Sequence, residues 1–319
     1  MLLHEDYPHP VPARAWLRWK ENYFWVFMDP ERDICCLAHS TAEPTFDRAF
    51  ASFTVLHKGQ RIGGGKEVAM PSPYELSRDL SFGDLQLRFL EPQKAFRVTY
   101  EDDILSAELD FTARMHLFDF QACADINPDQ YSVSENTALA RNEFRHQGQC
   151  VNGRGRIILK GGDFAGTAID VEGSGYRDHS WGMRNDQLTL DHNWSFFNFP
   201  NMGFHLFTVR NTIRPENRTW EGYHATPEGN QVIKTLAIEN EGEGPEGMPD
   251  KVIFRADAVD GRRFTLVADI GNAFARLPLQ SQKPGSKVYL NVENMCRVRC
   301  EETGEEGFAN VEIGSLIDA

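Results

Sequence analysis

The chain has 319 residues, a formal net charge of −14 at pH 7, and 41% hydrophobic and 11% aromatic residues. This length exceeds what one small hydrophobic core holds, so we expect one large or two medium domains, and the apolar content excludes a disordered chain. Binding to nucleic acid needs a clustered basic face, whereas the basic residues are scattered and the charge is acidic. We therefore expect no nucleic-acid partner.

The sequence also predicts a reduced, cytoplasmic protein. Its first ten residues, MLLHEDYPHP, lack the basic start and apolar run of a signal peptide. No stretch approaches the 18 apolar residues of a transmembrane helix, so we expect no integral membrane segment. The six cysteines include no CxxC pair, and Cys296 and Cys300 would lie too far apart on a strand for a disulfide.

Taken in chain order, the predicted elements are mostly strands. Short apolar or alternating runs bounded by turn residues are typical of strands and hairpins, and an Asp-Gly pair at 260–261 indicates a tight turn. One short helix is expected over 127–140, with Asn127 as its cap and Pro128 in its first turn. The predicted strand and hairpin runs are 23–28, 96–100, 104–115, 155–171, 204–212, 251–270 and 287–300. The fold class is therefore mainly β, with few helices.

A glycine cluster, DVEGSG at 170–175, follows one predicted hairpin and marks a candidate domain boundary. A division there gives an N-terminal β-domain over 1–172 and a C-terminal β-domain over 173–319, both of acceptable size. Both halves are patterned as β-meanders, which can form sandwiches or barrels. Exposed strand edges in either domain would permit a homodimer.

Several familiar catalytic and binding motifs fail on inspection. The stretch GQRIGGGKEV at 59–68 lacks the first glycine and the Ser or Thr of a phosphate loop, which favours a glycine-rich hairpin. There is no HExxH zinc motif and no GxSxG nucleophile motif. Four histidines, His179, His192, His205 and His224, fall in one region but show no recognisable ligand spacing. We predict neither a metal nor an organic cofactor.

The stretch GYRDHSWG at 175–182 combines a phenol, a guanidinium, a carboxylate, an imidazole and an indole. On a strand, Tyr176 and Asp178 point to one face, and His179 and Trp181 to the other. An apolar cavity would favour the neutral form of Asp178, which could then donate a proton with Tyr176 as its hydrogen-bonding partner. In this interpretation, His179 is a second proton-transfer group and Trp181 is a wall of the pocket.

The same stretch has a structural interpretation, which stays open at this point. Asp178 could pair with Arg177 and fix the junction between the domains, while His179 and Trp181 could be core residues. The densest aromatic stretch, HNWSFFNFPNMGFHLF at 192–207, is similarly open. Its Trp194, Phe196 and His205 are candidates for binding a substrate, or they fill a barrel.

Several segments resemble a bacterial superfamily that contains the hydroxyneurosporene synthases (carotenoid 1,2-hydratases) and AttH-like proteins. They are FRHQGQCVNGRGRI at 144–157, GYRDHSWGMR at 175–184 and GFANVEIG at 307–314. The resemblance covers most of the chain in order, and the RDHSWG signature is closest to an uncharacterised branch. It implies two consecutive lipocalin-like β-barrel or β-sandwich domains, with a ligand cavity at or near their junction.

The resemblance also implies a chemistry without cofactor or metal. A Tyr-x-Asp pair protonates an alkene in the carotenoid hydratases, and Tyr176 and Asp178 match that pair here. His146 matches the upstream part of the site, in the role of a substrate-binding residue. Fungal pericyclases share the paired β-domain architecture.

From this we expect an enzyme, a lyase, hydratase or isomerase that acts by general acid/base chemistry on a hydrophobic terpenoid, polyketide or aromatic compound. Two alternatives stay open. The chain could be a lipocalin-like carrier or sensor that leaves its ligand unchanged, or a pericyclase that mainly preorganises its substrate.

Overall fold

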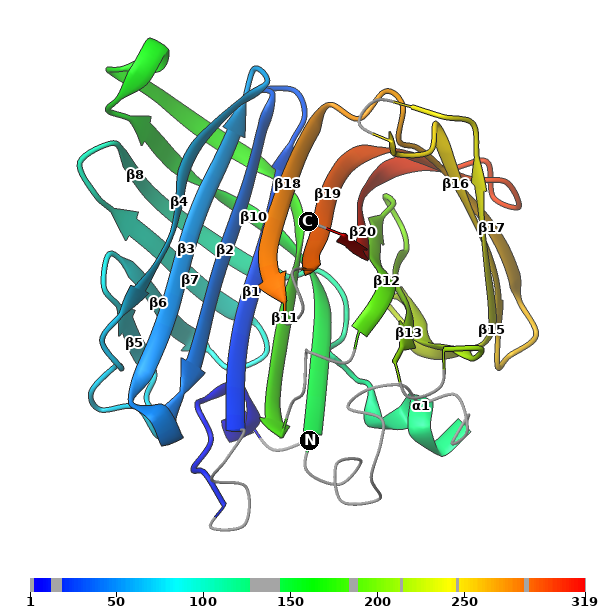
Figure 1. Ribbon diagram of the computed structural model, residues 1–319, viewed down its shortest axis with the longest axis horizontal. Helices are drawn as coiled ribbons and strands as arrows, with labels where there is room; N and C mark the ends of the chain where they lie inside the picture. Colours follow the sequence, from blue (N-terminus) through cyan, green and yellow to red (C-terminus); the bar gives the residue numbers. More distant parts are fainter. Residues whose placement is uncertain are drawn as a thin grey trace. The chain divides into compact units, whose positions relative to one another are not determined.

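The computed structural model describes residues 3–12, 19–126, 144–183, 189–212, 215–244, 247–283 and 287–318 (Figure 1). The chain forms two compact units. The first comprises Met1–Asp119 and Asn136–Arg184, and the second comprises Phe120–Glu135 and Asn185–Ala319. Each unit is built from antiparallel strands, which confirms the mainly β fold class.

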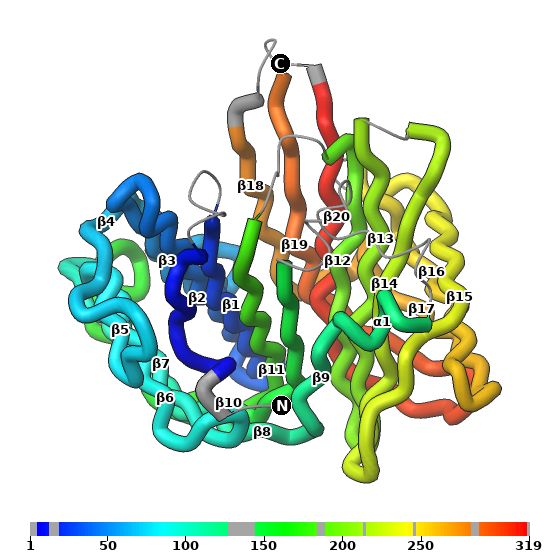
Figure 2. The backbone as a smooth tube through the Cα atoms, turned by 90° about the horizontal axis from the view of Figure 1, so that it is seen from below, coloured from blue at the N-terminus to red at the C-terminus, as the bar shows by residue number. Residues whose placement is uncertain are grey.

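The first unit is one antiparallel sheet whose strands follow the order β4-β3-β2-β1-β11-β10-β8-β7-β6-β5, with β9 paired to β10. The sheet curls round so that β4 approaches the turn after β5, where Lys66 pairs with Asp84 (Figure 2). Its strands are β1 (Trp19–Asp29), β2 (Ile34–Glu43), β3 (Arg48–His57), β4 (Gln60–Val68), β5 (Asp79–Phe82), β6 (Leu85–Glu91), β7 (Ala95–Glu101), β8 (Leu105–Ala113), β9 (Phe118–Asp119), β10 (Phe144–Leu159) and β11 (Thr167–Met183). Short 3-10 turns cover η1 (Leu3–Asp6), η2 (Pro44–Phe46) and η3 (Gly162–Phe164).

Alternation along each strand produces the core of this first barrel. In β7, Phe96, Val98 and Tyr100 are buried, whereas the residues between them are more exposed. The same alternation in β8 buries Leu105 to Phe111 at every second position. Because successive side chains of a strand point to opposite faces, one face of the curled sheet collects the apolar groups. This face is the inner face of the first barrel.

The second unit is a closed barrel of antiparallel strands. Its order is β17-β16-β15-β14-β13-β12-β20-β19-β18, and a further pairing of β17 with β19 closes the ring (yellow to red in Figure 1). Its elements are α1 (Gln121–Ile126), β12 (Thr189–Asn198), β13 (Gly203–Asn211), β14 (Arg218–Thr226), β15 (Gly229–Glu241), β16 (Lys251–Ala258), β17 (Arg263–Asp269), β18 (Ala275–Lys283), β19 (Lys287–Cys300) and β20 (Glu306–Asp318). Phe197, Phe204, Phe254 and Leu266 are among the buried side chains of its core.

Two consecutive lipocalin-like barrels are thus present, and every predicted strand run overlaps an observed strand. The stretch at 59–68 forms β4, paired with β3, as a hairpin predicts. The helix expected over 127–140 lies outside the described residues.

The boundary between the units differs from the expected division at residue 172. That position lies inside β11, which continues to Met183 and pairs with both β1 and β10 over its whole second half. The glycines at 173 and 175 do not interrupt the strand. Each glycine instead allows β1 to approach closely. A Cβ at Gly173 would lie 2.0 Å from the carbonyl oxygen of Met28, and a Cβ at Gly175 would lie 2.0 Å from that of Val26. The GYRDHSWG stretch therefore belongs to the first barrel and not to the second.

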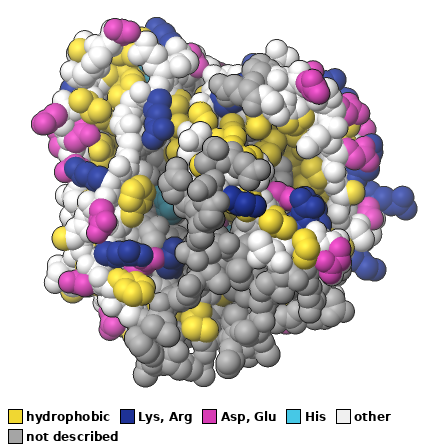
Figure 3. Space-filling model, in the orientation of Figure 1, with side chains coloured by type: hydrophobic (Ala, Val, Ile, Leu, Met, Phe, Trp, Pro, Cys, Tyr) yellow, Lys and Arg dark blue, Asp and Glu magenta, His cyan; other side chains and the backbone are white. Residues whose placement is uncertain are grey.

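Two whole-chain expectations can be compared with the described residues. Among them, no helix is long and apolar enough to cross a membrane. All six cysteines are buried and free. On the face drawn in Figure 3, basic side chains are dispersed among acidic ones.

Candidate functional site

The GYRDHSWG stretch lies on β11, between β1 and β10, and its two faces have different surroundings. Arg177 lies over the ring of Phe96 at 4.3 Å, and His179 stacks on Tyr23 with ring centroids 4.2 Å apart. Phe96 and Tyr23 both belong to the core of the first barrel. Arg177, His179 and Trp181 therefore face inward, and Tyr176, Asp178 and Ser180 lie on the opposite, outer face.

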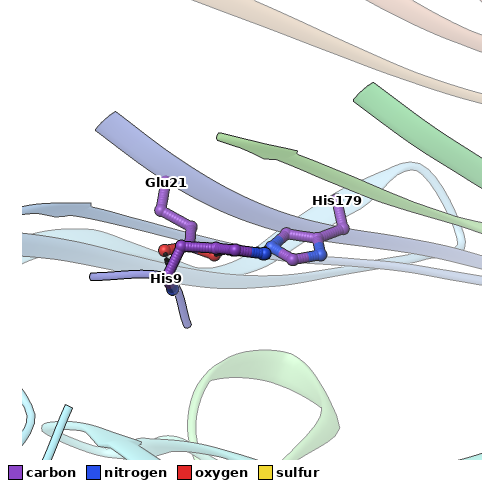
Figure 4. A group of neighbouring side chains, drawn as sticks. All are labelled: His9, Glu21 and His179. Carbon is purple, nitrogen blue, oxygen red and sulfur yellow. Dashed lines mark hydrogen bonds and ion pairs between the residues drawn. The ribbon is translucent and has the colours of Figure 1, made fainter. Parts of the chain in front are cut away.

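On the inner face, Glu21 of β1 is the centre of a buried cluster (Figure 4). Its Oε1 lies 2.8 Å from Nδ1 of His9 and 2.8 Å from Nε2 of His179. Its Oε2 accepts hydrogen bonds from the backbone N–H of His9 at 2.8 Å and from the hydroxyl of Tyr74 at 2.9 Å. The ring of His9 stacks on Trp181 at 4.1 Å. A carboxylate with this many donors is a well-satisfied buried anion.

A second ion pair lies beside this cluster, between Arg177 and Asp6. The guanidinium Nη2 is 2.9 Å from the Asp6 carboxylate, and its Nε donates to the Oε1 of Gln149 at 2.8 Å. Both charged side chains are almost completely buried. Gln149 in turn donates to the backbone carbonyls of Gln93 and Met115. Every polar group of this pair has a fixed partner.

Together these contacts hold the N-terminal segment, residues 5–9, inside the first barrel. Burial raises the pKa of Glu21, but the hydrogen bonds from His179 and His9 outweigh burial and hold this pKa at about 2. Burial lowers the pKa of His179, so the ring is neutral near pH 7 and donates its Nε2–H to Glu21. Glu21 is thus permanently ionised at neutral pH and is no proton donor. The inner face of the motif is a structural latch.

The ligand atoms of His9, Glu21 and His179 all lie within 4.8 Å of one another, a spacing at which three groups can bind one metal ion. In metal sites, the histidine nitrogen that does not bind the metal usually donates to a second partner. Here Nδ1 of His179 is buried and has no partner among the described residues. A metal bound at Nε2 would leave this nitrogen without the usual second partner. We therefore assign these three residues to proton sharing rather than to metal binding.

The outer face carries a different carboxylate–imidazole pair. Asp178 of β11 bonds through Oδ2 to Nε2 of His146 of β10, and the two side chains are 11% and 8% exposed. His146 lies directly opposite Ser180, so the pair is diagonal across the two strands. On the other side of β11, Asn22 donates to the Ser180 hydroxyl at 3.5 Å. This pair is nearly buried and shares none of the four donors described above for Glu21.

The surroundings of the Asp178–His146 pair are largely apolar. Phe24 lies opposite Asp178 on β1, and Gly148, which has no side chain, lies opposite it on β10. Phe118 of β9 pairs with Gly148 and so points to the same face. Tyr176, two residues before Asp178, is fully buried on this face. The outer face thus combines one titratable pair with aromatic side chains.

The remaining predicted site residues lie in the second unit. Trp194, Phe196 and His205 project from β12 and β13 away from the barrel core, and Trp194 meets His205 with ring centroids 4.6 Å apart. They do not fill the barrel, because Phe197 and Phe204 do.

The four histidines that fall in one region do not form one group. His179 belongs to the first barrel, while His224 contacts Phe264 in the core of the second. His192 and His205 lie on the outer face of the second barrel. Burial lowers the pKa of His224 to about 4, so this histidine is a neutral core residue.

Three residues of the latch were not anticipated: Asp6, His9 and Glu21. Glu21 carries a signal that could have revealed it, because it occupies an inward position of β1 between Trp19 and Tyr23, where the alternation calls for an apolar side chain. A charged residue on a core face requires buried partners. Asp6 and His9 lie outside any regular strand, and no periodicity marks them.

The fold and the site together define a class: proteins of two consecutive lipocalin-like antiparallel barrels with a nearly buried carboxylate–imidazole pair. The chain belongs to the family described as a domain of unknown function, DUF7064, which matches residues 3–317. A comparison with curated protein sequences finds no match.

Solved structures share the fold over nearly the whole chain. CghA with Sch210972 has a TM-score of 0.65 at 9% identity, covering 98% of this chain and 95% of its own. A protein described as AttH from Nitrosomonas europaea has a TM-score of 0.59 at 12% identity, covering 93% and 92%. Kievitone hydratase from Nectria haematococca has a TM-score of 0.58 at 12% identity, covering 98% and 91%. The expected AttH-like relationship is supported at the level of the fold.

Proposed function

We propose that this protein is an enzyme that adds to, eliminates from or isomerises a C=C bond of a hydrophobic small molecule by general acid/base chemistry. The observation that carries this proposal is the Asp178–His146 pair, nearly buried on an aromatic outer face. A carboxyl group and an imidazole in direct contact are suited to pass a proton to a substrate and to take one back. A hydratase among the proteins of this fold supports the proposal, although at 12% identity it shares the fold alone.

In the addition direction, the proton held between Asp178 and His146 passes to one alkene carbon. A C–H bond forms, the π bond breaks, and the other carbon becomes a carbocation. Water then donates an electron pair to that carbon and loses a proton, which His146 accepts and returns to Asp178. Atoms and charge balance with no cofactor. Elimination is the same sequence in reverse.

Tyr176 has a positioning role in this proposal, because it shares the face of Asp178 two residues away. Its phenol is suited to hydrogen bonding with the carboxyl group or with developing charge on the substrate. His179 and Trp181 have no part in the proposed mechanism, because they lie on the inner face beside Glu21 and His9. The proposal therefore keeps two of the three residues predicted as catalytic.

The proposal is tested by screening purified protein against acyclic terpenes and prenylated phenols in D2O, with products followed by mass spectrometry. We expect conversion with deuterium at the protonated carbon. Asp178→Asn should lose at least about 100-fold of the rate while still binding the substrate, as is typical when a general acid is removed. The matched control is Asp170→Asn, on the same strand but 73% exposed and paired with Arg156.

Two outcomes would contradict the proposal. If the ligand binds and is recovered unchanged, and Asp178→Asn has the same affinity, the protein is a lipocalin-like carrier. If a product forms without solvent deuterium and at an undiminished rate in Asp178→Asn, the protein is a pericyclase that acts by shape.

A further inference from the structure

The outer face of the second barrel carries a polar cluster that the proposed function does not use. Along β20, Val311 belongs to the barrel core, so Asn310 and Glu312 point to the opposite face. Both are part of the GFANVEIG stretch. Glu293 of β19 lies directly opposite Glu312. We call Glu293, Glu312, Asn310 and His192 the Glu293 cluster.

Glu312 is the anchored member of the Glu293 cluster. Nε2 of His192 lies 2.6 Å from its Oε1, and the amide of Asn291 donates to the same oxygen at 2.8 Å. The other ring nitrogen of His192 bonds to the hydroxyl of Tyr289 at 2.5 Å. A Cβ at Gly314 would lie 2.3 Å from the His192 ring, so glycine is required for this arrangement. The final glycine of the stretch therefore makes room for a fixed partner of Glu312.

Glu293 has a different environment, although it is the direct neighbour of Glu312. It is 3% exposed, and its one hydrogen bond among the described residues comes from the Asn310 amide at 2.6 Å. Burial and the adjacent Glu312 carboxylate raise the pKa of Glu293 well above its ordinary value. Two like charges directly opposite each other on a buried face repel, which favours the protonated form of Glu293. A neutral carboxyl group has an O–H to donate.

Asn310 is incompletely satisfied beside it. The residue is fully buried, and its Oδ1 has no hydrogen-bond partner among the described residues. Exchanging the amide oxygen and nitrogen would only move the vacancy to the nitrogen. A buried polar atom without a partner costs free energy and calls for an explanation. An acceptor without a partner among the described residues thus lies beside the carboxyl group of Glu293.

An aromatic surface borders the Glu293 cluster. Trp194 of β12 lies directly opposite Glu312, and Phe207 of β13 lies opposite Trp194. Both rings are partly exposed. The outer face of the second barrel therefore places the Glu293 carboxyl group, the unpartnered Asn310 oxygen and apolar rings in neighbouring positions.

We propose that the Glu293 cluster is a second ligand site, which binds an aromatic small molecule through a hydroxyl group. The ligand hydroxyl donates to Oδ1 of Asn310 and accepts from the Glu293 carboxyl, while its ring lies against Trp194. A hydroxyl satisfies the unpartnered Asn310 oxygen because it donates, whereas an ether or a ketone only accepts. The site does not depend on the activity of Asp178.

The test compares two probes with the same rings, 2-naphthol and 2-methoxynaphthalene, by calorimetry on the full chain. We expect 2-naphthol to bind at least tenfold more tightly. The preference should disappear in Asn310→Leu, which removes the acceptor. Glu293→Met should weaken both probes alike, because a hydroxyl oxygen and an ether oxygen both accept from the carboxyl group. The preference should persist in Glu293→Gln, which keeps a neutral donor, and in the control Asn240→Leu, on an exposed position of β15.

Equal affinity of the two probes, no measurable binding, or a preference that survives in Asn310→Leu would overturn the proposal. If Asn310→Leu does not fold, the smaller Asn310→Ala decides. Loss of the preference in that variant supports the site, and its retention contradicts the site.

Discussion

At the scale of single residues, two carboxylate–imidazole pairs of one strand have opposite roles because their surroundings differ. Glu21 accepts hydrogen bonds from His9, His179 and Tyr74 and is held ionised. Asp178 bonds to His146 and lies among aromatic side chains, with a glycine opposite. Both groups are carboxylates beside a histidine. The number of hydrogen-bond donors therefore distinguishes Glu21, a structural anion, from Asp178, the candidate acid.

The substitution Glu21→Gln should destabilise the protein by about 3 kcal/mol at pH 7, since a pKa of about 2 in place of 4.5 stabilises the folded state above pH 4.5. This contribution is lost as the pH falls from 4.5 towards 2, so the difference from the parent protein should shrink over that range. Denaturant unfolding at several pH values measures it. Glu108→Gln, at a 61% exposed side chain, is the control. A constant difference at all pH values would contradict this account.

At the scale of elements, β11 contributes its inner face to the structural latch and its outer face to the candidate site. Alternation sends Arg177 and His179 to the core, where the N-terminal segment is tied down, and leaves Tyr176 and Asp178 on the other face. The latch holds β11 against β1, and β10 supplies His146. Rigid neighbours on both sides are what a catalytic carboxylate requires to keep its geometry.

The close passage of β1 past Gly175 gives a second prediction at this scale. Gly175→Ala should destabilise the fold by about 1–3 kcal/mol or more, because the new Cβ would lie 2.0 Å from the backbone carbonyl oxygen of Val26. Gly64→Ala on β4 is the matched control, since the nearest atom there is a flexible arginine tip at 3.8 Å. Thermal unfolding of both variants compares them. Similar melting temperatures would show that β1 moves without cost.

At the scale of the whole molecule, every cysteine is free and buried, in both barrels. Burial raises the pKa of the thiols of Cys35, Cys36, Cys150 and Cys296. Thiols react as thiolates, so burial and a raised pKa both suppress reaction.

We therefore expect the folded protein to be inert to a thiol reagent such as dithionitrobenzoate, and six thiols to react once the chain is unfolded in guanidinium. The absorbance released by the reagent gives both numbers. Fewer than six thiols in the unfolded chain would reveal a disulfide, and rapid reaction of the native protein would reveal an exposed thiol.

The sequence by itself determined the mainly β class, the strand runs and the division of residues 175–182 between two faces, because these follow from local alternation and turn chemistry. It also indicated Tyr176, Asp178 and His146, through resemblance. It misplaced the boundary at residue 172, since glycines that permit close strand contact look like a linker in one dimension.

Only the tertiary structure decided which face of residues 175–182 points into the first barrel and which points outward. The partners of Arg177 and His179 are Asp6 and Glu21, more than 150 residues away, and no spacing rule connects them. The structure likewise brought Glu293 opposite Glu312 and left an Asn310 oxygen unpaired. Buried polar groups acquire their meaning from their partners, and those partners are set by the pairing of distant strands.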